Sequence, residues 1–252
     1  MKTAFVRFYE ELNYFLPKEK KKVRFEHNFK GSPSVKDMIE SLGVPHCEVD
    51  LILVNGTSVD FKYLVKDKDN ISVYPVFESL DIKKVQHLRA EPLRLPKFIL
   101  DVHLGALAKY LRMFGIDSLY RNNFSDKELI KISLEERRTI LTRDISLLKN
   151  GNVMRGYFVR NIIPEEQAKE IIIRFDLRRK IKKFSRCLEC NSNLIEIEKE
   201  KIINQLPPKV RAVQNKFYIC EKCNKLFWQG SHFNNMNVMA DKILSGLKII
   251  CS

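Results

Sequence analysis

Residues 98–120 read FILDVHLGALAKYLRMFGIDSLY, and this stretch predicts a strand, a helix and a second strand in succession. The apolar run Phe98–Leu100 predicts a short buried strand. Apolar residues then recur at helical spacing, and they are Leu104, Leu107, Ala108, Leu111 and Phe114. Gly115 is suited to end that helix, and residues 116–120 predict the next strand. A strand followed by a helix and another strand is typical of a parallel sheet.

The residues that follow continue this alternation. Ser125 and Glu128 have the pattern of a capping box, which predicts the start of a helix. Pro164 suits the first turn of a long helix that we expect to reach about Lys182. Between these helices we predict strands at 139–142 and 156–159 and a short helix at 145–149. The fold class is therefore α/β, with a parallel sheet covered by helices on both faces.

The N-terminal residues, 1–80, predict a separate β-grasp domain, the fold of ubiquitin. Ser34 is a typical helix N-cap and Gly43 a typical helix end, so one helix is expected between them. Strands are predicted on both sides of it, at 3–10, 23–29, 51–54 and 71–76. Residues 81–96 are basic and contain two prolines, which predicts a linker.

The formal net charge of +14 is unevenly distributed. Acidic and basic residues are equal in number over residues 1–80, so the whole surplus lies in residues 81–252. Such a surplus favours a polyanionic partner, most often nucleic acid, over a protein that is basic for no specific reason. The chain has no run of about 18 apolar residues and no apolar signal segment at its N-terminus, so we expect a cytoplasmic protein without a membrane span.

Four cysteines form two Cys-x2-Cys pairs, Cys187 with Cys190 and Cys220 with Cys223. Two such pairs place four thiolates around one ion, so we predict one structural zinc site in a small ribbon. All four ligands come from the protein, which leaves no open position for a catalytic water. The alternatives are disulfides, which the cytoplasm disfavours, or free thiols. The two cysteines without a partner at metal spacing are Cys47 and Cys251.

Three aspartates lie near the ends of separate predicted strands. Asp101 follows the first strand, Asp126 lies just past the second, and Asp144 follows the third. Ligands of open parallel sheets bind at the carboxyl ends of the strands, so we expect the three carboxylates to converge. Converging carboxylates repel one another, and Mg²⁺ or Mn²⁺ would compensate, because hard cations prefer oxygen ligands.

Such a cation site suits hydrolysis of a phosphodiester bond. Arg112 or Arg143 would bind the scissile phosphate through two parallel hydrogen bonds. The alternative is that the aspartates only cap helix N-termini, a role that suits Asp126 better than Asp101 or Asp144.

Four blocks of sequence resemble the Mut-seven C-terminal RNase family, and in order they are residues 101–117, 141–144, 186–191 and 227–232. The resemblance covers about residues 97–240 and implies a PIN-like nuclease fold joined to a zinc ribbon. It implies a metal-dependent RNase in which Asp101 and Asp144 occupy the acidic positions, with Asp126 a looser match. Arg112 and Asp117 also match, but Asp117 begins its strand, so we expect it to be structural. We place the nuclease domain at 97–184, the ribbon at 185–240 and a C-terminal tail at 241–252.

The N-terminal domain resembles the ubiquitin-like sulfur carriers of thiamin and molybdopterin synthesis, in the order of its elements and in residues 54–56 and 69–75. Those carriers end in an activated Gly-Gly tail, whereas this chain continues through residues 78–81, Glu-Ser-Leu-Asp. We therefore expect the shape without the sulfur chemistry, as a stabilising module or a docking site for a protein partner.

A basic tract stands before the first cysteine pair, and its six cations are Arg178, Arg179, Lys180, Lys182, Lys183 and Arg186. It predicts a phosphate-binding surface, although a solvated helix face is an equal alternative. His232 is a candidate phosphate contact or acid, or it makes a structural hydrogen bond. Aromatic residues near the ribbon would stack on bases or form its core, and these are Phe184, Phe217, Tyr218, Phe227 and Trp228.

These observations lead to two functional hypotheses. The first is a metal-dependent ribonuclease, a hydrolase whose aspartate cluster cleaves RNA held by the zinc ribbon and the basic tract. The second is a non-catalytic RNA-binding adapter with a ubiquitin-like domain that docks a partner.

Overall fold

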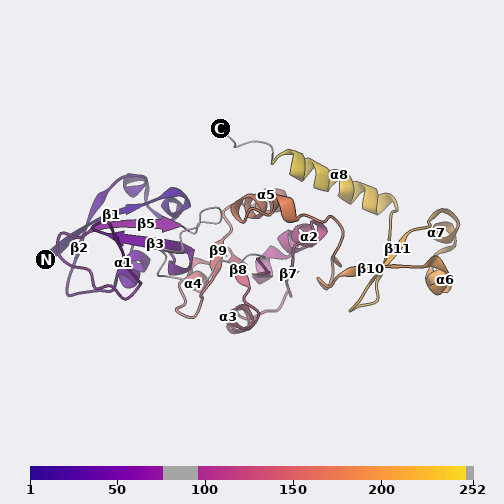
Figure 1. The fold of residues 1–252 in the computed structure, drawn as a ribbon, viewed down its shortest axis with the longest axis horizontal. Helices are drawn as coiled ribbons and strands as arrows, with labels where there is room; N and C mark the ends of the chain where they lie inside the picture. The colour runs from indigo at the N-terminus through magenta and orange to yellow at the C-terminus, as the bar shows by residue number, and fades with distance from the viewer. Residues whose placement is uncertain (76–95, 248–252) are drawn as a thin grey trace. The chain divides into compact units, whose positions relative to one another are not determined.

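The computed structural model describes residues 1–75 and 96–247, and the chain divides into two compact units (Figure 1). One unit combines the N-terminal residues with Asp144–Phe158, and the other combines Pro96–Arg143 with the chain from Val159 onward. The ribbon therefore belongs to the same unit as most of the α/β domain. The expected linker up to residue 95, and Cys251, lie outside the described residues.

The N-terminal domain has the expected β-grasp fold. Its sheet has the order β2-β1-β5-β3-β4, in which β1 and β5 are parallel and the other pairs are antiparallel. The strands are β1 (Lys2–Phe8), β2 (Phe25–Phe29), β3 (Val49–Val54), β4 (Thr57–Ser58) and β5 (Asn70–Pro75), and the helix is α1 (Val35–Ser41). Ala4, Val6 and Phe8 alternate along β1 and are buried in the core, as their spacing predicts. Ser34 caps α1 by accepting the Asp37 N–H.

The α/β domain contains a four-stranded sheet of order β7-β6-β8-β9, in which β6 pairs in parallel with β7 and β8. The strands are β6 (Phe98–Leu100), β7 (Ser118–Leu119), β8 (Thr139–Thr142) and β9 (Gly156–Phe158). The helices are α2 (Gly105–Met113), α3 (Asp126–Glu135), α4 (Ile145–Leu148) and α5 (Pro164–Arg174). Helix α2 packs on α5, and α3 lies on the opposite side of the sheet (Figure 1). This arrangement confirms a parallel sheet covered on both faces.

Two helices of this domain end in a left-handed residue. Gly115 has a φ of +79° and ends α2, and the Ile116 N–H bonds to the Leu111 carbonyl across it. A methyl group on Gly115 would lie 2.4 Å from the Lys182 carbonyl oxygen, so the glycine also permits a close approach of the chain.

The helix expected to run from Pro164 to about Lys182 is shorter than predicted. It ends at Arg174 because Asp176 adopts a φ of +45° and the Leu177 N–H bonds back to the Ile172 carbonyl. Part of the basic tract therefore forms a separate 3-10 turn, Arg178–Lys180, and the rest is non-helical.

The ribbon is a three-stranded antiparallel sheet of order β10-β11-β12. Its strands are β10 (Leu194–Ile197), β11 (Phe217–Cys220) and β12 (Leu226–Trp228). The long connection between β10 and β11 contains α6 (Lys199–Ile202) and α7 (Pro208–Val213), and Pro208 occupies the first position of α7. Helix α8 (Ser231–Ser245) follows and packs on α5 (Figure 1). This helix continues through residue 240, where we placed the boundary between the ribbon and the C-terminal tail.

The segment Asp144–Phe158 packs against the β-grasp domain. The Glu48 carboxylate accepts the Phe158 N–H at 2.5 Å, and the Phe158 ring lies 5.5 Å from the Tyr14 ring and 5.7 Å from the Phe15 ring. The Cys47 thiol donates to the Leu148 carbonyl at 3.4 Å. The N-terminal domain thus contributes both buried apolar surface and hydrogen bonds to this segment.

Candidate functional site

The four cysteines of the two pairs form one cluster. Within residues 1–75 and 96–247, they are the only group of three or more His, Cys, Asp or Glu side chains whose ligand atoms lie within 4.8 Å of one another. The sulfurs of Cys187 and Cys223 are 3.7 Å apart, and those of Cys190 and Cys220 are 3.2 Å apart. Tetrahedral zinc with bonds of about 2.3 Å requires sulfurs about 3.8 Å apart, whereas a disulfide requires about 2.05 Å. The cluster therefore fits a four-thiolate metal site.

The protonation equilibria of these thiols differ sharply. Burial raises the pKa of Cys187 to about 12. Burial also opposes ionisation of Cys190, but hydrogen bonds from Ser192 and from the Cys220 and Cys187 thiols outweigh it and lower its pKa to about 6. Four thiols packed together cannot all ionise without a compensating cation, and a divalent ion would supply that charge.

Arg112 attaches the first cysteine pair to the α/β domain. Its side chain is buried, and its Nη1 donates to the Leu188 and Glu189 carbonyls at 2.8 Å each. Its Nε donates to the Ser118 carbonyl at 2.9 Å. This guanidinium is therefore engaged with backbone carbonyls, a geometry that favours a structural role over the phosphate-binding role expected from the sequence.

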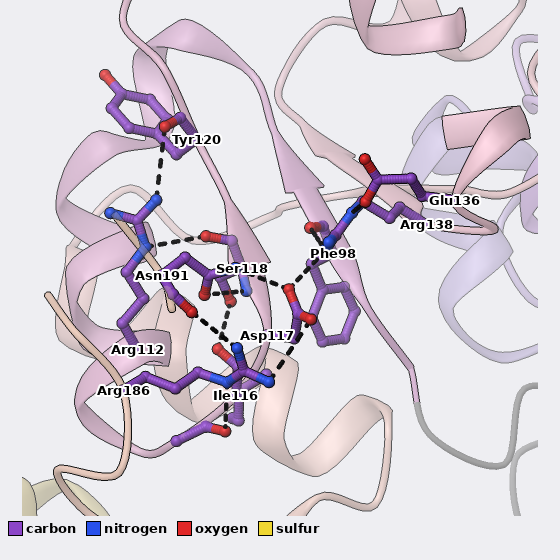
Figure 2. Close-up of polar contacts among 11 residues, drawn as sticks. Phe98, Arg112, Ile116, Asp117, Ser118, Tyr120, Glu136, Arg138, Arg186 and Asn191 are labelled. Atoms are coloured by element: carbon purple, nitrogen blue, oxygen red, sulfur yellow. Dashed lines mark hydrogen bonds and ion pairs between the residues drawn. The ribbon is translucent and has the colours of Figure 1, made fainter. Parts of the chain in front are cut away.

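Asp117 lies at the centre of a second set of contacts between the α/β domain and the ribbon (Figure 2). Its carboxylate accepts hydrogen bonds from Arg138 at 2.6 Å and from Asn191 at 2.8 Å, and Arg186 lies at 3.6 Å. The Asn191 side chain also accepts the Ser118 N–H at 2.9 Å. Asp117 thus joins strand β7 to the ribbon, which agrees with the structural role expected from its place at the start of a strand.

The charges around Asp117 keep its carboxylate ionised. Burial alone would raise its pKa, but hydrogen bonds from Arg138 and Asn191 and the charges of Arg138 and Arg186 outweigh burial and lower it. Arg186, one of the six cations of the basic tract, also donates to the Gly115 and Asn191 carbonyls.

Asp101 lies at the carboxyl end of β6, as expected, and is buried. Its Oδ2 accepts a hydrogen bond of 2.7 Å from the Thr142 hydroxyl at the end of β8. Asp101 precedes a 3-10 turn, but its side chain accepts no capping hydrogen bond from that turn. Within the described part of the chain, its Oδ1 has no hydrogen-bond partner. The capping alternative therefore does not account for Asp101.

Asp144 caps helix α4. Its Oδ1 accepts the Ser146 N–H and hydroxyl at 2.7 and 2.6 Å and the Leu147 N–H at 3.4 Å. The hydrogen bond from the Ser146 side chain is the main cause that lowers its pKa, backbone hydrogen bonds add to it, and burial opposes it. Capping was expected to suit Asp126 best, yet Asp144 is the aspartate that caps, because α4 begins at the next residue.

Asp126 is exposed in the first turn of α3, where Ser125 is the cap. Ser125 and Glu128 form the predicted capping box, with bonds of 2.9 and 3.3 Å. Among the described residues, Asp101, Asp126 and Asp144 do not form a group whose carboxylate oxygens all lie within 4.8 Å of one another.

Arg143 holds the loop after β9. Its Nη1 donates to the Val159, Arg160 and Asn161 carbonyls at 2.7, 2.9 and 2.8 Å. Like Arg112, the Arg143 guanidinium, which we expected to bind phosphate, thus donates hydrogen bonds to backbone carbonyls.

The cations of the basic tract divide into two kinds. Lys183 binds Asp241 at 2.8 Å and Asn237 at 2.7 Å on α8, and Arg186 binds Asp117, so these two side chains hold the domain together. The exposed members are Arg178, Arg179, Lys180 and Lys182. His232 is exposed in the first turn of α8. The described geometry therefore leaves four tract cations and His232 on the surface.

Sequence reasoning gave no role to three polar residues that the structure makes central. Thr142 orients Asp101, Arg138 neutralises Asp117, and Asn191 bonds across to β7. Asn191 directly follows a cysteine pair and has a φ of +71°, a conformation that Asn tolerates well, so its position offered a signal. Both Thr142, the last residue of β8, and Arg138, which directly precedes β8, are buried polar residues, and nothing in their spacing reveals their partners.

The fold and the cysteine cluster define a two-part protein, in which a ubiquitin-like domain precedes an α/β domain with a four-cysteine ribbon. The model of the Mut7-C RNAse domain matches residues 96–240, and the model of the Mut7-C ubiquitin domain matches residues 1–81. The chain therefore belongs to the Mut7-C RNAse domain family, and this membership points to a nuclease-like function. Comparisons with curated proteins and with solved structures gave no match. No helix among the described residues has the length and apolar character needed to cross a membrane.

Proposed function

We propose that this protein is a metal-dependent ribonuclease that hydrolyses RNA phosphodiester bonds, with zinc as the structural ion of its ribbon. The observation that carries the catalytic proposal is the setting of Asp101. Its carboxylate is buried at a strand end, is fixed through one oxygen by Thr142, and is not used to cap a helix. Ligand sites of parallel sheets form at this end of the strands.

Asp101 and Asp144 are the residues that would hold a divalent cation. Asp144 follows Thr142 by two residues, so chain connectivity alone keeps its Cα within about 7.6 Å of the Cα of Thr142. Both carboxylates offer the oxygen ligands that Mg²⁺ and Mn²⁺ prefer. A bound cation would supply an activated water and stabilise charge on the phosphate oxygens. The exposed cations of the basic tract would bind RNA phosphates, and His232 is a further candidate for such a contact.

Replacement of either aspartate is expected to abolish most RNA cleavage. Asp101→Asn and Asp144→Asn should each lower the rate with Mg²⁺ or Mn²⁺ at least about 100-fold, the scale at which one charge-stabilising group acts. The measurement is cleavage of a panel of defined RNAs, with circular dichroism to confirm folding.

Asp126→Asn serves as the comparison variant, because Asp126 is exposed on α3 and makes no hydrogen bond or ion pair within the described residues. We expect this variant to cleave at close to the parent rate. Equal cleavage by the parent, Asp101→Asn and Asp144→Asn would refute the mechanism.

Thr142→Val is expected to weaken catalysis through Asp101 rather than directly. The substitution keeps the shape of a buried side chain and removes the hydroxyl that donates to Asp101. Loss of such an orienting contact costs about 10- to 100-fold in metal affinity or activity. The Mn²⁺ concentration for half-maximal cleavage should rise, and Thr142→Ser, which keeps the hydroxyl, should restore it. An unchanged Mn²⁺ dependence in Thr142→Val would show that Thr142 has no positioning role.

A non-catalytic RNA-binding adapter is the second candidate. The observation that favours it is that Asp144 caps α4, while Arg112 and Arg143 bind backbone carbonyls. These contacts give each side chain a structural purpose without a reaction. If the protein is an adapter, it will bind RNA in a binding assay but will not cleave it with either Mg²⁺ or Mn²⁺.

The ubiquitin-like domain acts, in this proposal, as a stabilising module and as a docking site for a protein partner. Its contacts with Leu148 and Phe158 support the stabilising role, because they cover a segment that begins at Asp144. We place the protein in the cytoplasm, where thiols remain reduced and available to zinc.

A further inference from the structure

A cavity of about 830 Å³ lies between the ribbon sheet, helix α7 and the first turns of α8. Its volume falls within the range of about 300–1,000 Å³ that is usual for ligand sites. Five aromatic residues line it, and they are Phe184, Tyr218, Phe227, Trp228 and Phe233. None of them is fully buried, unlike Phe217, which forms the ribbon core. The walls therefore expose part of the flat apolar surface of these rings to the cavity.

The lining of the cavity is cationic. It includes four Lys and Arg residues and a single acidic residue, Glu189, which pairs with Lys225 at 3.2 Å. Lys209 and His232 also line it, are exposed, and make no ion pair with any residue in the described ranges. The charge left uncompensated at the cavity is thus positive.

We propose that this cavity binds one or two nucleotides of single-stranded RNA; the choice of RNA as the ligand rests on the proposed function. An unpaired nucleotide combines a flat apolar base with a charged phosphate. The base would stack on Tyr218 or Trp228, and the phosphate would lie near Lys209 or His232. A double-stranded RNA has its bases stacked inside and offers no such face.

The position of the basic tract next to the cavity also supports single-stranded RNA as the ligand. Lys183 and Arg186 belong both to the basic tract and to the cavity wall, so the exposed tract leads along the chain to the cavity. Both of these side chains are paired with carboxylates, and Lys209 is the cation of the lining that has no ion pair with a described residue. A phosphate backbone bound to the exposed members of the tract would bring its bases to the aromatic walls of the cavity. An apolar peptide would fill the aromatic walls but would leave Lys209 and His232 without complementary charge.

The chain has a single tryptophan, Trp228, and it lines the cavity, so its fluorescence reports on this site alone. We would titrate the full-length zinc-loaded protein, without Mg²⁺ or Mn²⁺, with an unlabelled oligoadenylate of eight nucleotides. Stacking should quench Trp228 emission saturably at the concentrations at which a labelled oligoadenylate shows binding by anisotropy. Inorganic tripolyphosphate, which has no base, should compete weakly and should not quench.

Matched variants test base stacking and phosphate binding separately. Tyr218→Leu should weaken oligoadenylate binding at least about fivefold, the lower limit for loss of one base–aromatic stack, and Tyr218→Phe should retain binding. Lys209→Gln should reduce the slope of log K against log salt by about 0.7, the value for one phosphate of a single strand. Lys127→Gln removes an exposed charge on α3, outside the cavity, and should change neither quantity.

Unchanged Trp228 emission at saturating oligoadenylate would overturn the proposal, as would parent-like binding by Tyr218→Leu and Lys209→Gln together. Quenching by apolar peptides but not by oligoadenylate would instead assign the cavity to a protein partner. The assay is separate from the cleavage assay. Quenching without cleavage would support RNA binding by the cavity and refute the ribonuclease proposal. Cleavage without quenching would support the ribonuclease proposal and refute RNA binding by the cavity.

Discussion

A Cys187→Ser variant is expected to lose zinc and to unfold the ribbon. Structural zinc contributes an apparent binding free energy of about 10–16 kcal/mol in zinc-finger peptides, and the apolar core of this sheet is small. Its apolar core contains only three fully buried side chains among the described residues, and they are Ile202, Leu206 and Phe217. Metal analysis should find one zinc per parent chain and less in the variant, and hydrogen exchange over residues 194–228 should become fast.

Cys47→Ser is the matched control for this loss. Cys47 is buried in the other compact unit and has no cysteine partner at metal spacing, so its replacement should leave the zinc content at one per chain. A Cys187→Ser protein that retains one zinc and parent-like exchange would contradict the assignment of the ion to these four thiolates. Because all four ligands are cysteines, zinc removal should act on folding first and on RNA binding only as a consequence.

An Asp117→Ala variant is expected to lower the free energy of unfolding by about 1.5–3 kcal/mol, the range for loss of hydrogen bonds to a charged group. The Arg138 guanidinium, whose side chain is 8% exposed, would lose one of its two carboxylate partners and keep the other, Glu136, at 2.6 Å. The Asn191 amide would lose an acceptor as well, so the contact between β7 and the ribbon would weaken. Urea unfolding followed by Trp228 fluorescence measures the change in the unit that contains Asp117.

Glu135→Ala provides the comparison with a surface pair. Glu135 lies 3.9 Å from Lys131, and both side chains are more than half exposed, so its loss should cost less than about 1 kcal/mol. Equal decreases in the free energy of unfolding for the two substitutions would show that burial of the Asp117–Arg138 pair does not increase its contribution to stability.

The pH dependence of Asp117→Ala follows from the direction of the pKa shift. Asp117 has a lowered pKa in the folded protein, so its contribution is present above the ordinary value of 3.8 and is lost as the pH falls through the lower folded value. The stability difference between parent and variant should therefore be constant near neutral pH and should shrink below about pH 4. A difference that grew on acidification would contradict this reading.

Much of the fold was accessible from local sequence signals. The capping box at Ser125, the helix end at Gly115 and the alternation along β1 each depend on residues close in the chain, and each is present. The end of α5 was not accessible, because it depends on Asp176 in a left-handed conformation that glycine usually supplies. The helices of the ribbon connection, α6 and α7, were not predicted from the sequence either.

The site was less predictable than the fold, and the reason is physical. Spacing identifies the four cysteines because metal geometry is set locally by each Cys-x2-Cys pair. The same reasoning identified Asp101 and Asp144 as strand-end carboxylates but could not show which of them caps a helix. Arg112 illustrates the general difficulty. Its partners, the Leu188 and Glu189 carbonyls, lie far along the chain, and backbone oxygen carries no sequence signal.

The contacts of Phe158 bear on how the protein is divided for experiments. Sequence comparison places a domain boundary before residue 96, whereas packing assigns Asp144–Phe158 to the β-grasp unit. A fragment that starts at residue 96 would expose the Phe158 ring and would leave its backbone N–H without the Glu48 acceptor. Such a fragment should be prone to aggregate, and the safer unit for expression and crystallisation is the whole chain.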